Sequence, residues 1–504
     1  MTKNLRFASQ QASSAPPRKR LARKESSTGS ESGYENSASS DYSDSETGRS
    51  TSASSTWDDE PVKHAIILPN YKEDMDTLRE TLDILASHSI ARSSYEIYLA
   101  MEQGELGCEV KATTLQKEYE KRFRNIEYTV HPGGIDGEAQ GKSSNLCWAA
   151  KYINGKYTDE FEKKNIIVTV MDSDSHLLSK YFTMINNLHY GNPDTASTTM
   201  YVPPLIFDRN AHLVPRLVRV ADLLWAAAGL SSHYAGSTIC PPTSVYSLSL
   251  SLVDIAGGWD AGREAIGEDL HMYIKCFFAL NGHLTTRSVY SAASHSNVHS
   301  SGKGIRGYFH GMQLRYKQAM RHMWGSLDSG FVVKSLGNSW RKQTSDGKRL
   351  NLWNTWVLMI RMFEAHFLPQ HITFLILGGA LYTLLTPTQQ VPRLLLQVLD
   401  LTGYMRVVTA MAFIYFFTFY EPYHKICLQT REKEMARVGL ADRMVDAFSH
   451  RSLKAHGLDF CVFPISGVIY GTVPAVVAMF RQFWTLDLVY NVSMKPTRMQ
   501  LPSP

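Results

Sequence analysis

The sequence has few cysteines, and those it has are scattered. Only six occur in 504 residues: Cys108, Cys147, Cys240, Cys276, Cys427 and Cys461. They show neither the spacing of a metal site nor that of a disulfide framework, which predicts a reducing compartment for most of the chain. No apolar stretch follows Met1, so no cleaved secretory signal is expected. The net charge of +5 is too small to predict a nucleic-acid partner.

Large apolar side chains are also scarce in residues 1–60. Serine, threonine and charged residues dominate there. Such a segment cannot bury enough surface to offset the entropy of ordering it, so we predict a disordered, Ser-rich tail. A basic cluster over residues 18–24 is either a solvated run of charge, a contact for anionic lipid or a targeting signal.

Long apolar runs are concentrated after Leu350. Three segments, 367–385, 407–420 and 462–480, come close to the roughly 20 residues that a bilayer requires. They predict about three membrane spans within a region 367–486, followed by a tail over 487–504; a buried helical core is the alternative. The segment 352–363 carries Trp353 and Trp356, which favours interfacial helices over 331–366.

Basic residues gather between the second and third predicted spans. This connection contains Lys425, Arg431, Lys433, Arg437, Arg443, Arg451 and Lys454, whereas the connection between the first two spans contains only Arg393 and Arg406. The positive-inside rule then places the basic loop, and the domain before the spans, on the cytosolic side of a multi-pass membrane protein. The pattern does not distinguish the plasma membrane from the Golgi or endoplasmic reticulum.

Short apolar strands alternate with helices in the first half of residues 61–330. Strands are predicted over 64–68, 95–101, 126–130 and 166–170, with helices near 72–87, 110–124 and 142–152. This alternation predicts a doubly wound α/β domain. After Thr199 the pattern is less regular, with helices over 217–230, 270–280 and 316–323 and a long loop over 291–307.

Asp172 and Asp174 follow the strand 166–170 directly. Ligands of open α/β sheets bind at this end of the strands, and an unpaired buried carboxylate is costly. Oxygen ligands suit Mg²⁺ or Mn²⁺, which usually bind together with substrate phosphates. The alternative is that Asp174 or Ser175 caps the helix that follows.

Four other motifs carry groups suited to the same chemistry. Lys142 opens a helix after a glycine-rich loop and can reach a phosphate, or is simply exposed. Gln318 and Arg321 share a helical face, where an arginine can clamp phosphate oxygens; the alternative is an amphipathic helix at a membrane surface. Glu268 and Asp269 begin a helix whose dipole they also favour. The segment 69–73 at a strand end can hold a base or form an ordinary turn.

In this order, the motifs resemble the inverting GT-A glycosyltransferases of family two, in the membrane-bound branch with cellulose, chitin and hyaluronan synthases. The resemblance covers about residues 62–325 and the trailing spans, and it implies a GT-A nucleotide-sugar domain. It assigns nucleotide-sugar contacts to Pro69, Tyr71, Glu73, Glu102, Lys142, Asp172, Gln318 and Arg321. It assigns a Mg²⁺ or Mn²⁺ ion to Asp172 and Asp174, and the catalytic base to Asp269.

Two positions depart from the family pattern. Glu102 stands where an aspartate is usual. The family's Gln-x-x-Arg-Trp has tryptophan directly after arginine, but here His322 follows Arg321 and Trp324 lies about 200° around the helix from that place. The predicted acceptor contacts are Glu268, Trp259 and Trp324.

The resemblance implies a metal-dependent, inverting transfer of a sugar from a nucleotide sugar, expected to be a UDP-sugar, to a hydroxyl acceptor at the cytosolic face of a membrane. Synthesis of a cell-surface or cell-wall polysaccharide is the first expectation, and a homodimer or a membrane partner would then supply further spans. Transfer of a single sugar to a lipid acceptor is one alternative. The other is an inactive, membrane-anchored protein that binds sugar nucleotides.

Overall fold

The computed structural model describes residues 61–139, 141–300, 302, 304–340, 347–373, 375, 378–387, 391–441, 448–486 and 488. The predicted Ser-rich tail 1–60 and most of the tail 487–504 lie outside these residues.

The sheet domain is built on seven strands in the order β3-β2-β1-β4-β7-β5-β8. They are β1 Lys63–Asn70, β2 Tyr95–Glu102, β3 Asn125–His131, β4 Ile166–Val170, β5 Thr199–Val202, β7 Tyr246–Ser249 and β8 Thr285–Ser288. The first four strands pair in parallel, which confirms the predicted α/β class. The sheet is mixed, however, because β7 runs antiparallel to both β4 and β5.

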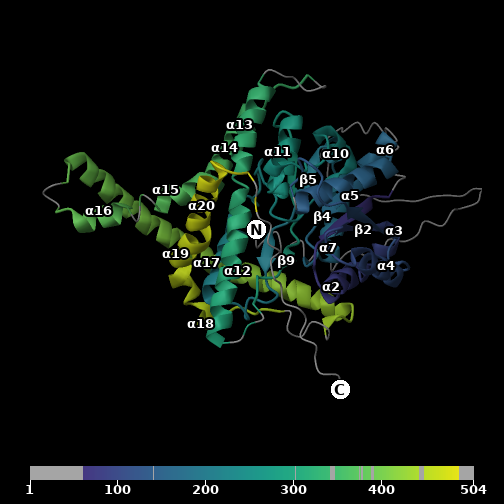
Figure 1. Ribbon diagram of the computed structural model, residues 1–504, viewed down its shortest axis with the longest axis horizontal. Helices are drawn as coiled ribbons and strands as arrows, with labels where there is room; N and C mark the ends of the chain where they lie inside the picture. Colours follow the sequence, from purple (N-terminus) through teal and green to yellow (C-terminus); the bar gives the residue numbers. More distant parts are fainter. Residues whose placement is uncertain are drawn as a thin grey trace, which may run out of the picture.

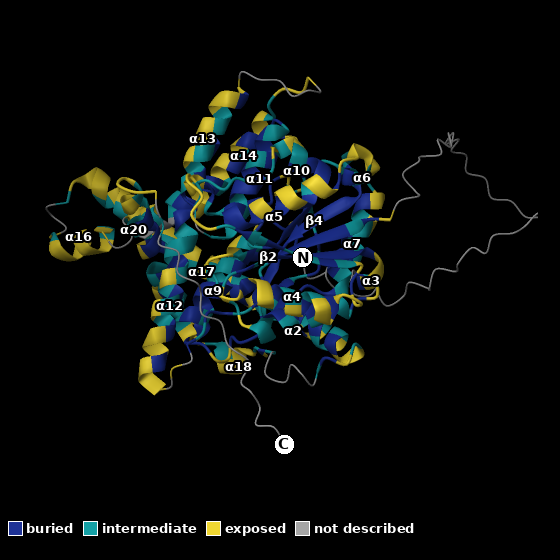
Figure 2. Cartoon of the chain, turned by 45° about the vertical axis from the view of Figure 1, so that its right-hand side comes forward, coloured by how far each residue is buried: buried dark blue, intermediate teal, exposed yellow. Residues whose placement is uncertain are grey.

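Helices cover both faces of this sheet, because alternate side chains of each strand point to opposite sides. Ile66 and Leu68 of β1 pack in a core with the helices α2 (Met75–Ala86), α4 (Cys108–Tyr119) and α7 (Ser179–Tyr190). Ala65 and Ile67 pack in a second core with α5 (Lys142–Lys156), α10 (Leu250–Ala256) and α11 (Glu268–Ala279). Figure 2 shows the sheet as a buried layer between partly exposed helices. The smaller elements are α3 Ala91–Ser94, α6 Glu160–Lys164, α8 Pro193–Ala196, η2 Arg263–Ala265 and a two-stranded sheet of β6 Leu205–Phe207 and β9 Ala293–His295.

The remaining helices form a second region beside the sheet domain (Figure 1). They are α9 Arg216–Leu230, α12 Gly304–Trp324, α13 Leu327–Ser339, α14 Leu352–Met362, η3 Phe363–Phe367, α15 Leu368–Thr373, α16 Gly379–Leu385, α17 Arg393–Arg437, α18 Leu453–His456, α19 Asp459–Gly467, η7 Val468–Thr472 and α20 Val473–Gln482. The loop predicted over 291–307 contains β9 and the start of α12.

Two helical runs in the described part of the chain are long and apolar enough to cross a membrane: α17, and the continuous run Asp459–Gln482 from α19 to α20. They contain the second and third predicted spans. The first predicted span, 367–385, includes residues outside the described part of the chain; its described residues include the end of η3, α15 and α16. This span therefore stays a prediction. The predicted interfacial segment 352–363 is helical, with Trp353 and Trp356 exposed.

The last turns of α17 are hydrogen-bonded to the sheet domain. Arg431 Nε donates a hydrogen bond of 2.9 Å to Oδ2 of Asp208, which lies just after β6. Glu434 accepts from the backbone N–H of Ser179 at 2.7 Å, at the start of α7. Arg431 and Asp208 are both buried, so this candidate membrane helix is joined to the sheet domain by a desolvated ion pair.

Candidate active site

Four segments bring polar side chains to the edge of the sheet where β1, β2 and β4 end. Asp172 follows β4, and Lys142 is the first residue of α5. Ser244 precedes β7, and Glu268 and Asp269 begin α11. Gly141, which precedes Lys142, has a φ of 142°, a conformation that side chains rarely tolerate, so glycine at this position sets the direction in which α5 begins.

Lys142 is the centre of this cluster. Its Nζ lies 2.9 Å from Oδ1 of Asp172 and 2.6 Å from Oε1 of Glu268. Burial opposes the charge of the ammonium group, but the carboxylates of Asp172, Glu268 and Asp269 outweigh it and raise the pKa of Lys142. Lys142 is therefore a permanent cation among three acids.

Ser244 connects two of these acids. Its hydroxyl donates to Oδ2 of Asp172, and its backbone N–H donates to Oδ2 of Asp269 at 2.6 Å. Its φ is 75°, which is uncommon for a residue other than glycine and is typical of strained functional turns. The sequence analysis missed Ser244; the only signal is a turn-forming run of two prolines, residues 241–242, ahead of it.

Two aromatic side chains fix Glu268, one directly and the other through the first. Tyr246 donates its hydroxyl to Oε2 of Glu268, and Trp259 donates Nε1–H to the Tyr246 hydroxyl oxygen, both at 2.8 Å. Burial raises the pKa of Glu268 to about 7, with Lys142 acting against this effect. Trp259 is itself buried in the core. Its predicted contact with an acceptor stays a prediction; in this structure Trp259 fixes Tyr246 beneath Glu268.

Asp174, the second acid of the Asp-x-Asp motif, is buried. Its backbone carbonyl accepts a hydrogen bond from Nη1 of Arg209, and Nη2 of Arg209 is bound to Glu80 at 2.9 Å. The helix after it, α7, has Leu178 at its N-cap and no side-chain cap bond. Asp174 and Ser175 therefore do not cap this helix, which removes the structural alternative for the Asp-x-Asp motif.

No group of three or more His, Cys, Asp or Glu side chains suited to a metal ion occurs among the described residues. A magnesium ion in an enzyme is, however, commonly held by one or two carboxylates and completed by substrate phosphates and water. Asp172 and Asp174 fit this pattern, because they supply the oxygen donors that a hard cation requires.

The remaining predicted nucleotide contacts lie at the same edge. The register aligns Asn70 of β1 with Met101 of β2, so the turn containing Tyr71 and Glu73 follows β1 beside Glu102. Glu73 accepts from the backbone N–H of Tyr71 at 2.6 Å, which closes this turn. Pro69 is the last but one residue of β1.

Glu102 is bound to a histidine that the sequence analysis did not single out. Its Oε2 lies 3.0 Å from Nδ1 of His131, and Nε2 of His131 lies 2.9 Å from Glu138. Burial raises the pKa of Glu102, while His131 acts in the opposite direction. The extra methylene relative to aspartate thus lets Glu102 reach the end of β3.

The end of α12 presents two different faces. Trp324 is buried, donates Nε1–H to the carbonyl of Leu486 at 3.3 Å and accepts from Gln482 through its own carbonyl at 3.0 Å. The predicted contact of Trp324 with the acceptor stays a prediction; in this structure its ring packs against the segment that follows α20. Gln318 and Arg321 stay partly exposed on α12.

His322, the residue in place of the family tryptophan, lies near the Lys142 cluster. Burial lowers the pKa of His322, the charges of Arg321, Arg315 and Lys142 lower it further, and the charge of Asp172 acts in the opposite direction. Its ring packs against Trp225 of α9, with centroids 4.9 Å apart. Trp225, rather than Trp324, is thus the large aromatic side chain beside the site.

A buried pair supports the start of α11. Nδ1 of His271 lies 2.6 Å from Oδ1 of Asp328, and its Nε2 lies 3.0 Å from Asp260. A Cβ on Gly267 would lie 3.1 Å from Oδ2 of Asp328 and 3.3 Å from the Cα of Gly325. Gly267, found where the family typically has threonine, therefore allows α13 to pack closely beneath Glu268 and Asp269.

The charge on His271 gives a pH-dependent stability. Burial disfavours the imidazolium, but hydrogen bonds to Asp260 and Asp328 outweigh it and raise the pKa of His271 to about 9. Between pH 6.5 and 9 the folded protein thus binds a proton that the unfolded chain has lost, so this contribution is complete below pH 6.5 and disappears as the pH rises through 9. We expect the melting temperature in detergent to fall over this window, and to fall less in His271→Gln. Equal slopes in the two proteins would contradict this assignment.

Comparisons with known proteins were made for sequence and for structure. The family model described as glycosyl transferase family group 2 matches residues 167–420. No curated protein matches. Among solved structures, the mannosyltransferase PcManGT from Pyrobaculum calidifontis, in complex with GDP-Man and Mn²⁺, is 12% identical with a TM-score of 0.42, over 77% of this chain and 86% of that one. TarS from S. aureus is 13% identical with a TM-score of 0.34, over 68% and 53%.

The family match spans half of the chain and includes the acids of the site, whereas Lys142 precedes it. Asp172, Lys142's partner, lies near its beginning, and Glu268, Asp269 and Arg321 lie within it. The protein therefore belongs to glycosyl transferase family group 2 and is a glycosyltransferase.

Proposed function

We propose that this enzyme transfers a sugar from a UDP-sugar to a hydroxyl acceptor by a single displacement at the cytosolic face of a membrane, with Asp269 as the base. The observation that carries the proposal is the convergence of Asp172, Lys142 and Asp269 on one turn at Ser244. A cation and a base are thereby held beside each other, as a transfer from a diphosphate requires.

Asp269 is placed to accept the proton of the attacking hydroxyl. The Ser244 N–H and the Leu270 N–H each donate to one of its oxygens, at 2.6 and 2.9 Å, so the carboxylate is fixed in orientation. Loss of this proton makes the acceptor oxygen a nucleophile toward the anomeric carbon. One displacement then inverts the configuration at that carbon.

We assign Lys142 and Arg321 to the leaving group, the nucleoside diphosphate. Lys142 is already paired with Asp172, so its ammonium is held where negative charge collects on the departing diphosphate. Arg321, one residue before His322 on α12, supplies a second cation for those oxygens. Pro69, Tyr71, Glu73, Glu102 and Gln318 complete the proposed nucleotide contacts.

Asp172 and Asp174 would hold the Mg²⁺ or Mn²⁺ ion. When bound, such an ion neutralises charge on the diphosphate leaving group. Asp172, with 30% of its side chain exposed, is the accessible donor, and Asp174 lies deeper.

The proposed acceptor is a saccharide in the synthesis of a cell-surface or cell-wall polysaccharide. A polymer also needs a path across the bilayer, and two candidate spans among the described residues are too few to enclose one. This reading therefore requires a homodimer or a membrane partner. The same observation favours a second candidate, the transfer of one sugar to a lipid acceptor.

The direct test incubates the purified, full-length protein in detergent with a panel of nucleotide sugars and Mn²⁺, and measures released nucleoside diphosphate. We expect release from a UDP-sugar, and more of it when a saccharide or lipid acceptor is added. Binding of the donor without any turnover would instead support a sugar-nucleotide-binding protein. Sizing the radiolabelled product separates a polymer from an organic-extractable lipid with one added sugar.

Asp174→Ala is expected to weaken nucleotide-sugar binding and the dependence on Mn²⁺ together. Asp172→Asn, at a half-exposed position that tolerates substitution better, should give the same pattern. Titration of Mn²⁺ at fixed donor concentration measures both effects. If both variants keep the Mn²⁺ dependence of the unaltered protein, the assignment of the metal to these residues is contradicted.

Substitutions of Trp225 and Trp324 together test which tryptophan contacts the acceptor. Trp225→Ala should lower transfer to the acceptor by about tenfold while donor hydrolysis persists, because an aromatic face is lost beside the site. Trp324→Ala should lower protein yield and thermal stability, with transfer and hydrolysis falling together, because Trp324 is buried against the end of α20. Initial rates with and without acceptor distinguish them; the reverse pattern would return the acceptor contact to Trp324.

A further inference from the structure

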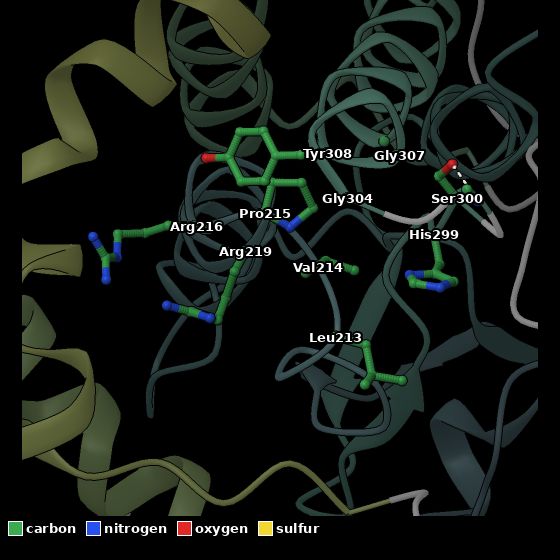
Figure 3. Close-up of a pocket in the computed structure, with 12 residues that line it drawn as sticks. Leu213, Val214, Pro215, Arg216, Arg219, His299, Ser300, Gly304, Gly307 and Tyr308 are labelled. Carbon is green, nitrogen blue, oxygen red and sulfur yellow. Dashed lines mark hydrogen bonds between the residues drawn. The ribbon is translucent and has the colours of Figure 1, made fainter.

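A cavity of about 470 Å³ lies away from the catalytic cluster, at the beginnings of α9 and α12. Its lining includes Arg216, Arg219, Tyr308 and His299 (Figure 3). Arg321, a proposed contact of the donor, and His322 lie at the other end of α12, more than a dozen residues along that helix. The cavity is thus separate from the proposed donor site.

The two arginines that line the cavity, Arg216 and Arg219, lie beside one buried acid, Asp459. Asp459, fully buried at the start of α19, accepts from Nη2 and Nε of Arg219 at 2.8 and 3.0 Å. Arg216 lies 3.6 Å from the same carboxylate and keeps 42% of its side chain exposed. Arg219 is therefore fixed, and Arg216 is the arginine that remains accessible to a ligand.

The surrounding ion pairs leave an excess of positive charge. Arg451 binds both Asp459 and Glu421, at 3.2 and 2.8 Å. Three guanidinium groups (Arg216, Arg219 and Arg451) thus share two carboxylates, which leaves one positive charge in excess. An anion in the cavity would offset it, and guanidinium groups bind phosphate oxygens with strong, charge-assisted hydrogen bonds.

Two features place the cavity at the level of lipid headgroups. Glu421 follows the exposed apolar part of α17, which reaches Phe419, and Asp459 begins the α19–α20 run. Because Arg451 joins these two acids, the polar ends of both candidate spans meet beside the cavity.

Exposed apolar side chains also lie near Tyr308 on α12. Ile305, three residues before Tyr308, is 78% exposed, and Phe309, directly after it, is 63% exposed. In Figure 3 the Tyr308 ring lies over Pro215, with its hydroxyl on the side of Arg216. A tyrosine hydroxyl and an arginine next to exposed apolar residues is the composition of a surface that contacts both headgroup and acyl chain.

We infer that this cavity binds the phosphate of an anionic membrane lipid, with Arg216 and the Tyr308 hydroxyl as its contacts. The inference depends on α17 and α19–α20 lying in a membrane, and not on the proposed sugar transfer. It adds to the enzyme a lipid site at the junction between the candidate spans and the sheet domain.

The test uses the full-length protein in detergent and native mass spectrometry. The probes are short-chain phosphatidic acid, phosphatidylcholine of the same chain length, and inorganic phosphate. We expect saturable binding of phosphatidic acid that is at least about tenfold tighter than binding of phosphatidylcholine. Arg216→Ala should weaken it by about tenfold, and Tyr308→Phe by less.

Arg361→Ala is the matched control, since Arg361 lies on α14 beside exposed tryptophans but not in the cavity. It should bind phosphatidic acid as the unaltered protein does. Equal binding of both lipids, or no loss in Arg216→Ala, would overturn the inference. Inorganic phosphate that binds as tightly as the lipid, and through Arg216, would also overturn it, because the ligand would then be free phosphate. Size-exclusion profiles check that each variant is folded.

Discussion

Asp269→Asn is expected to abolish sugar transfer and to leave nucleotide binding nearly intact. Asparagine keeps an oxygen that can accept from the Ser244 N–H, so the turn at Ser244, whose hydroxyl binds Asp172, should be retained. The amide cannot accept a proton from the acceptor, and loss of a general base costs on the order of 10² to 10⁴ in rate. Initial rates of transfer and calorimetric binding of UDP measure the two effects separately.

The control for this substitution is Asp194→Asn, at an exposed position of α8, which removes one carboxylate far from the cluster. It should transfer sugar at the unaltered rate. Transfer by Asp269→Asn at a rate close to that of the control would show that another group accepts the proton.

Lys142→Met should have the second large effect, on donor binding and stability together. Methionine fills similar space but leaves Asp172 and Glu268 without their cation, 2.9 and 2.6 Å away in the unaltered protein. Removing one partner of a buried ion pair costs on the order of 3 kcal/mol of stability. UDP affinity should fall by more than tenfold, because a cation facing the diphosphate is lost. Thermal melting and UDP titration follow the two losses.

A second substitution separates these two roles of Lys142. Adding Glu268→Gln to Lys142→Met removes one of the two negative charges that have lost their cation, so thermal stability should partly recover while UDP affinity stays low. If UDP affinity recovers as well, Lys142 acts only by neutralising Glu268. Unaltered UDP affinity in Lys142→Met would exclude a contact with the diphosphate.

The residues that the sequence revealed are those at the ends of regular elements. Asp172 follows a strand of five buried residues, so its place at the edge of a sheet followed from the pattern. Asp269 lies in the first turn of an apolar helix, and the family resemblance was needed to assign it to the same site. Ser244 could not be found in this way. It acts through a backbone N–H and a positive φ in a turn, and β7, which follows it, is a short antiparallel strand with no signal in the apolar pattern.

The partners of the site residues were equally hidden, because they are remote in the chain. His271 and Asp328 are 57 residues apart, and Trp324 meets Leu486 across 162 residues. The helical period correctly indicated that Trp324 points away from the place of the family tryptophan. It could not indicate that α20 would cover Trp324, or that Trp225 of α9 would pack against His322 instead.

The apolar runs predicted helices better than they predicted spans. Hydropathy located α17 and the α19–α20 run, but it could not show that the last turns of α17 leave the apolar segment to bind Asp208 and the start of α7.

The measurement that most directly tests the central claim is the anomeric configuration of the first product, read by NMR from a single turnover with the UDP-sugar that supports transfer. With Asp269 as base and one displacement, the new linkage should have the configuration opposite to that of the donor. A product with the donor's own configuration would contradict the account, because it would require two displacements and a nucleophile on the enzyme.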